Sequence, residues 1–124
     1  MELVHGGHFK SLMNEYKQNN QWFSEIDIAL IMKTLLNAVH YIHNKNIVHR
    51  DIKPENILIE NKSDFSTLKI ADFGLSAQFG RSNMSKIMTQ QCGTIIFMAP
   101  EQISNKIYSK VKIFFHICFH FNSY

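Results

Sequence analysis

His49-Arg50-Asp51-Ile52-Lys53-Pro54-Glu55-Asn56 carries more information than any other part of this chain. The string supplies a carboxylate at Asp51, an amine at Lys53 and a side-chain amide at Asn56. Further along the chain, Asp72-Phe73-Gly74 adds a second carboxylate followed closely by a glycine. A positioned carboxylate can accept a proton from a hydroxyl, and amide and carboxylate oxygens are hard donors that suit magnesium. Both functions are needed for phosphoryl transfer, so the two strings together predict a site for that chemistry.

Two helices are expected before the quoted string. Phe9 to Tyr16 places its apolar residues on one face, and Asn19-Asn20 interrupts the pattern. A longer helix is expected to begin near Ser24, a good N-cap that forms an approximate capping box with Asp27. Apolar residues that recur in steps of four and three predict the core-facing stripe of this helix: Ile28, Met32, Leu35, Val39 and Ile42. Ile31 and Ala38 widen the stripe.

Short strands are expected on both sides of the quoted string. Ile47-Val48 predicts a strand that enters it, and Ile57-Leu58-Ile59 predicts a strand that leaves it. Leu68 to Ala71 predicts a third strand, which ends at Asp72. A hairpin of the second and third strands would bring Asn56 and Asp72 to adjacent edges of one cleft.

Composition excludes several other classes of protein. The 124 residues suffice for one domain, and 45% of them are hydrophobic, as in globular proteins. The net charge of +3 comes from scattered Lys and Arg residues, so nucleic-acid binding is not expected. The longest apolar run, 113–121, is too short to span a membrane. Two cysteines and the lack of a recognisable signal peptide favour a reducing, cytoplasmic location.

The two strings resemble the catalytic loop and the magnesium-binding loop of eukaryotic protein kinases. The resemblance covers roughly residues 1–111 and is nearest to the calcium- and calmodulin-dependent branch of serine/threonine kinases. It implies an α+β fold: a mostly helical partial C-lobe, in which a small β-hairpin carries the catalytic and magnesium-binding loops. The N-lobe, with its Gly-rich loop and strand lysine, is expected to be absent. Residues 112–124 match nothing in the family and are expected to form a divergent apolar tail.

The resemblance also implies a role for each polar residue of the two strings. Asp51 would accept the proton of the substrate hydroxyl, and Asn56 and Asp72 would hold Mg2+ against the phosphates of ATP. Lys53 would contact the transferring phosphate, which favours serine or threonine as the acceptor in a protein substrate. An isolated surface carboxylate or lysine is the alternative interpretation of these residues, but it does not explain why they occur together.

Met1 to Gly7 resembles the hinge between the two kinase lobes. By position, the Glu2 carbonyl and the Val4 amide would bind adenine, and Leu58 would form the floor of the adenine pocket. A flexible terminus followed by a Gly-Gly turn is the alternative for the first segment. Leu58 can equally be a core residue of its strand.

Leu75 to Gln91 is polar and lacks periodicity, so we expect a flexible activation loop, which Ala99-Pro100-Glu101 would close as in the family. Arg50 precedes the catalytic aspartate, and a guanidinium there is suited to bind a phosphate on that loop. Thr89 is the best candidate for modification by an upstream activating kinase, and Thr94 would contact the catalytic loop. Hydroxyl groups without a role are the alternative for this loop.

The expected function is therefore ATP- and Mg2+-dependent phosphoryl transfer to serine or threonine of proteins, by a partial domain that is inactive alone. A catalytically dead kinase-like module that binds partners or substrates is the alternative. His116, Cys118 and His120 could suggest a metal cluster, but no second group stands at zinc spacing elsewhere in the chain.

Overall fold

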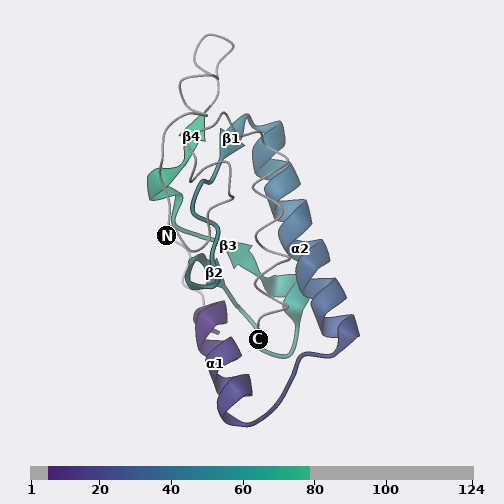
Figure 1. Cartoon of the computed structure of the whole chain (residues 1–124). Helices are drawn as coiled ribbons and strands as arrows, with labels where there is room; N and C mark the ends of the chain where they lie inside the picture. Colours follow the sequence, from purple (N-terminus) through teal and green to yellow (C-terminus); the bar gives the residue numbers. More distant parts are fainter. Residues whose placement is uncertain (1–5, 79–124) are drawn as a thin grey trace, which may run out of the picture. The chain divides into compact units, whose positions relative to one another are not determined.

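The computed structural model describes residues 6–78 (Figure 1). These residues fall into two compact units. The first contains residues 6–39 and 53–72, and the second contains residues 40–52 and 73–78. Helix α2 runs from the first unit into the second. Helices and small antiparallel sheets together make an α+β fold, as the sequence predicted.

Both predicted helices are present, α1 over Phe9–Gln18 and α2 over Glu25–Asn44. Ser24 and Asp27 form the predicted capping box at the start of α2. The Asp27 N–H donates to the Ser24 hydroxyl oxygen (3.1 Å), and the Ser24 N–H donates to the Asp27 carboxylate (3.1 Å). These reciprocal bonds satisfy two backbone N–H groups that a helix start leaves without helical partners.

The buried stripe of α2 is centred differently from the predicted one. Ile31, expected at the margin, is fully buried together with Leu35, both with 0% exposure. Ile28 and Met32, expected at the centre, are only half-buried. A line of four- and three-residue steps can be drawn through either set of residues, so periodicity alone could not choose between them.

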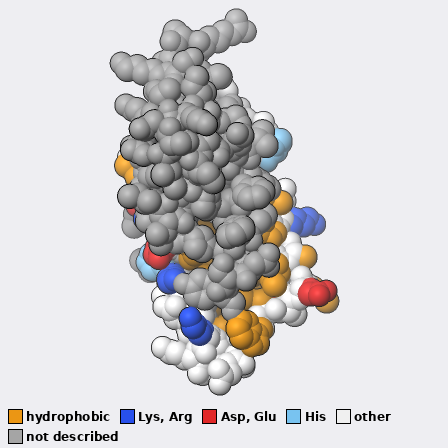
Figure 2. Space-filling model, viewed as in Figure 1, with side chains coloured by type: hydrophobic (Ala, Val, Ile, Leu, Met, Phe, Trp, Pro, Cys, Tyr) orange, Lys and Arg blue, Asp and Glu red, His pale blue; other side chains and the backbone are white. Residues whose placement is uncertain are grey.

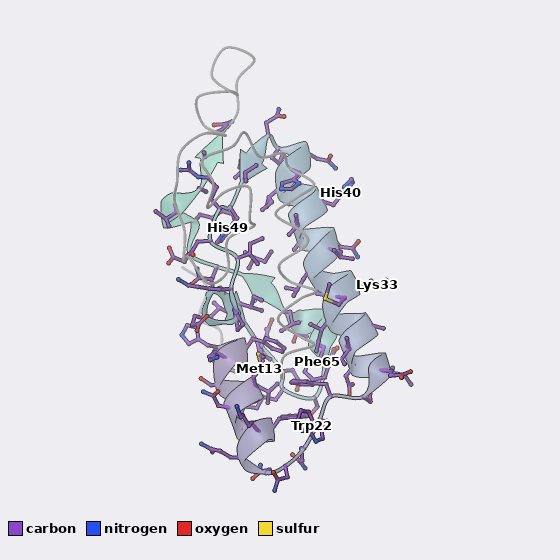
Figure 3. All side chains as sticks on the ribbon, in the orientation of Figure 1. Met13, Trp22, Lys33, His40, His49 and Phe65 are labelled. Atoms are coloured by element: carbon purple, nitrogen blue, oxygen red, sulfur yellow. The ribbon has the colours of Figure 1, made fainter. Side chains whose placement is uncertain are left out.

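Aromatic side chains join the elements of the first unit. The Phe23 ring, just before α2, stacks on Tyr16 of α1 with 4.3 Å between ring centroids. It also lies edge-on to Phe65, at 5.7 Å. Phe65 begins the 3-10 turn η2 (Phe65–Thr67) and is 5% exposed, as is Met13 of α1 (Figure 3). Each aromatic pair contributes about 0.5–1.5 kcal/mol beyond the area it buries.

Within residues 6–78, four two-residue strands form two antiparallel pairs. In the first unit, β2 (Ile57–Leu58) pairs with β3 (Lys69–Ile70), which confirms the predicted hairpin. In the second unit, β1 (Ile47–Val48) pairs with β4 (Ala77–Gln78). The expectation of a flexible loop from residue 75 onward was therefore wrong for β4, because a pairing with a strand far earlier in the chain leaves no local pattern to recognise.

The loop between β2 and β3 is held by its own side chains. The Asp64 carboxylate accepts hydrogen bonds from the Ser66 hydroxyl (2.6 Å) and the Ser66 N–H (2.9 Å). These bonds favour the charged form, so they lower the pKa of Asp64 from its ordinary value of 3.8. At the edge of the loop, Lys62 forms an ion pair with Glu15 of α1 (2.6 Å), which ties the loop to the helix.

Hydrophobic side chains also reach the surface of the described region (Figure 2). The most exposed of the large ones are Trp22 (76%) and Ile26 (81%), at the start of α2. Within residues 6–78, neither helix combines the length and the apolar character needed to cross a bilayer.

Candidate active site

The β2–β3 hairpin brings the two predicted magnesium ligands together in the first unit. Asn56 ends the 3-10 turn η1 (Pro54–Asn56) immediately before β2, and Asp72 follows β3 after Ala71. The Ala71 N–H donates to the Asn56 carbonyl oxygen at 2.8 Å, so Asn56 lies opposite the residue that precedes Asp72. Asn56 is buried, with 7% exposure, whereas Asp72 is exposed. The hairpin thus holds an amide and a carboxylate at one end.

The chemistry of this pair fits magnesium. Both side chains offer hard oxygen donors, and Mg2+ is commonly held by one or two protein groups together with substrate phosphates. Among the described residues, no three His, Cys, Asp or Glu side chains gather into a metal cage. A pair of oxygen donors such as Asn56 and Asp72 suits an ion whose other ligands are phosphate oxygens and water.

Two residues of the His49–Asn56 and Asp72–Gly74 strings have an unusual backbone conformation. Arg50 has a φ of 69° and Asp72 a φ of 59°, in the left-handed region that disfavours side chains other than Asn, Asp and Gly. For Arg50 such a conformation costs about 1–2 kcal/mol, whereas aspartate at position 72 adopts it more readily. Strained residues of this kind concentrate at functional sites. Asn20 and Asn46 also have positive φ, but they lie in turns, where asparagine is common.

The second unit carries the predicted proton acceptor. Asp51 is buried, with 8% exposure, and its N–H donates to the His49 ring nitrogen Nδ1 (3.3 Å). His49, labelled in Figure 3, is fully buried and lies edge-on to the Phe73 ring, with 4.8 Å between centroids. Phe73 begins the 3-10 turn η3 (Phe73–Leu75), and the Arg50 Nε donates to the Leu75 carbonyl (2.6 Å). Side chains of residues 49 and 50 therefore connect the catalytic string to the residues after Asp72.

The remaining predicted site residues are placed as follows. Lys53 is half-buried, and its carbonyl accepts from the Asn56 N–H (2.9 Å), which closes the turn between them. Leu58 lies half-buried in β2. The roles assigned to these residues stay predictions. The other predicted site residues lie outside the described residues: Glu2, Val4, Thr89 and Thr94. The expected domain boundary between residues 111 and 112 also lies outside them.

The last two residues of the predicted hinge and the residue after them are attached to the end of β2. The Ile59 N–H donates to the Gly7 carbonyl (2.8 Å), and His8 forms a β-bridge with Leu58. Gly6 lies close to the backbone of Ile59, because a Cβ atom added to Gly6 would stand 2.2 Å from the Ile59 carbonyl oxygen. Gly7 has open space around it but a φ of 82°. Gly6 is thus required for its small size, and Gly7 for its backbone conformation.

We expect Gly6→Ala to destabilise the protein by about 1–3 kcal/mol, because overpacking against a backbone atom forces the segment away from β2. Gly7→Asn is the matched control and should cost much less, since asparagine tolerates positive φ. Urea unfolding of both variants measures the difference. Equal losses of stability would contradict the close approach at Gly6.

Comparison with known proteins decides the family. The model of the protein kinase domain matches residues 1–115. This chain belongs to the protein kinase family. The resemblance found in the sequence is confirmed, and the β2–β3 hairpin and its two oxygen donors are part of a kinase domain.

Similar kinases are found in distant organisms. The chain is 40% identical to serine/threonine-protein kinase 33 of Mus musculus, over 89% of this chain and 23% of that protein. It is 41% identical to myosin light chain kinase A of Dictyostelium discoideum, over 89% of this chain and 35% of that protein. It is 48% identical to calcium/calmodulin-dependent protein kinase type I of Schizosaccharomyces pombe, over 71% of this chain and 26% of that protein. The chain therefore spans about a quarter to a third of the length of these relatives.

Sequence reasoning missed one contact at this kinase site. The ring of His8 reaches the carbonyl of Glu55, next to Asn56, at 2.7 Å. Local pattern gives no signal for a bond whose two residues stand so far apart in the chain.

Proposed function

We propose that this chain is part of a serine/threonine protein kinase that transfers the terminal phosphoryl group of ATP to proteins. The observation that carries the proposal is the joint placement of Asn56 and Asp72 by the β2–β3 hairpin in a chain of the kinase family. Magnesium, when bound, would neutralise charge on the phosphate oxygens. The sequence relationship to a kinase named for serine and threonine supports the acceptor class.

Each residue has a distinct part in the proposed reaction. Asp51 orients the substrate hydroxyl and accepts its proton, and Lys53 contacts the phosphate being transferred. Asn56 and Asp72 hold Mg2+ through their oxygens, while Leu58 contributes to the adenine pocket with Glu2 and Val4. Asp51 is buried and its N–H donates to the His49 ring, so its carboxylate is carried on a restrained backbone.

We also propose that an upstream kinase regulates this protein through Thr89, with Arg50 as the residue that binds the phosphate and Thr94 as a contact of the catalytic loop. Support comes from Arg50, whose Nε already bonds to the Leu75 carbonyl at the start of the predicted activation loop. A phosphate offers a guanidinium a stronger, charged acceptor.

Incubating the full-length protein with radiolabelled ATP, Mg2+ and mixed peptide substrates tests the proposal. Label is expected on serine and threonine after acid hydrolysis of the peptides. Label confined to tyrosine would contradict the acceptor class. Substrate binding without any transfer would favour the alternative of a kinase-like binding module.

A further inference from the structure

We infer that His8 is a positioning residue for Asn56, acting through a hydrogen bond from its ring to the backbone of the η1 turn; this inference rests on the proposed magnesium role of Asn56. The ring nitrogen Nδ1 lies 2.7 Å from the Glu55 carbonyl oxygen. A carbonyl can only accept, so Nδ1 carries the proton and donates it. His8 and Glu55 both belong to the first unit.

The bond acts on the peptide group that immediately precedes Asn56. That planar group contains the Glu55 carbonyl and the Asn56 N–H. The carbonyl accepts from His8, and the N–H donates to the Lys53 carbonyl at 2.9 Å. Both ends of one rigid plane are therefore bonded, which leaves it little freedom to rotate.

The peptide group that follows Asn56 is held as well. Its carbonyl accepts from the Ala71 N–H at 2.8 Å, across the β2–β3 hairpin. The Cα atom of Asn56 thus stands between two restrained planes, and the direction of its side chain is restricted to the rotamers that this backbone permits. The bond from His8 restrains the peptide group that precedes Asn56, and it comes from a residue far away in the sequence.

The turn η1 needs such support. It is a three-residue 3-10 turn, a conformation with poor hydrogen-bond geometry. Lys53 stands at the N-cap position of this turn, and its side chain forms no capping hydrogen bond to it. His8 is itself well anchored, because its carbonyl accepts from the Ser11 N–H (3.0 Å) at the start of α1 and its backbone forms a bridge with Leu58 of β2.

The test uses the full-length protein with three substitutions. His8→Phe keeps an aromatic ring but removes the donor. His8→Asn restores a donor, because its amide nitrogen is bonded to Cγ just as Nδ1 is in histidine. Asn56→Ala removes the metal ligand itself. Mn2+ serves as the probe in the presence of ATP, and its dissociation constant is measured by electron paramagnetic resonance.

We expect His8→Phe to weaken Mn2+ binding about 10-fold, the lower end of the effect seen when the support of a metal ligand is lost. His8→Asn should bind Mn2+ nearly as the wild type does. Hydrogen exchange supplies a second readout, because the Asn56 N–H should exchange faster in His8→Phe. The Ile28 N–H of α2, which donates to the Ser24 carbonyl just before the helix (2.9 Å), should exchange at an unchanged rate.

The outcomes separate this inference from the proposed function. Wild-type Mn2+ binding in His8→Phe, with weakened binding in Asn56→Ala, would overturn the role of His8 alone. Unchanged binding in Asn56→Ala would overturn the magnesium role of Asn56 and the role of His8 with it. Equal acceleration at Asn56 and Ile28 in His8→Phe would make His8 a residue of general stability, which also overturns the inference.

Discussion

Asp51→Asn in the full-length protein is expected to lower the rate of phosphoryl transfer about 100- to 10,000-fold, the usual contribution of a positioned acid or base. Asparagine has the same shape as aspartate but cannot accept a proton from the substrate hydroxyl. The hydrogen bond from the backbone N–H of residue 51 to the His49 ring does not involve the side chain of residue 51, so it should persist. A radiolabelled ATP transfer assay at saturating substrate measures the rate.

Asp64→Asn is the matched control for this prediction. Asp64 caps the η2 turn through an oxygen that accepts from Ser66. Asparagine caps about as well as aspartate, so the turn should remain and the rate should be unaffected. Thermal unfolding of both variants checks that the fold is intact. If folded Asp51→Asn transfers phosphate at the wild-type rate, Asp51 is not the proton acceptor.

Asp72→Asn should be the second substitution with a large effect, and its signature is a changed requirement for magnesium. Asparagine tolerates the positive φ of residue 72, so the substitution removes the charge without adding backbone strain. A metal ion stabilises the charge of a phosphoryl transition state by several kcal/mol. Losing about 3 kcal/mol of this transition-state stabilisation lowers the rate roughly 100-fold.

The dependence of the Asp72→Asn rate on Mg2+ distinguishes a metal ligand from a structural residue. The half-saturating Mg2+ concentration should rise, and part of the lost rate should return when Mg2+ is increased. Asp72→Gly, which also accepts positive φ but offers no oxygen ligand, should be impaired further. A lower rate in Asp72→Asn that is insensitive to Mg2+ would show that Asp72 acts in some other way.

Gly6 and His8 give the predicted hinge end a structural role beyond adenine binding. Gly6 admits a close approach to the Ile59 carbonyl, and His8 bonds to the carbonyl of Glu55. The same short segment is therefore joined to the end of β2 and to the turn that carries Asn56. Substitutions there are expected to affect the proposed magnesium site through the backbone of the η1 turn.

The sequence alone determined the features that depend on neighbouring residues. Ser24 and Asp27 lie within one helical turn, so their capping box could be recognised before the structure was known. The chemical types at Asp51, Asn56 and Asp72, and their spacing, identified the family. Apolar residues on both sides of a polar loop likewise predicted the β2–β3 hairpin, because its two strands are close in the chain.

Tertiary structure decided the features that need a distant partner. The pairing of β4 with β1, the choice of Ile31 as the centre of the α2 stripe, and the bond from His8 to Glu55 have no local signature. Each depends on which surface or acceptor another segment presents after folding. Local pattern records which side chains are available, but only packing selects the partners they meet.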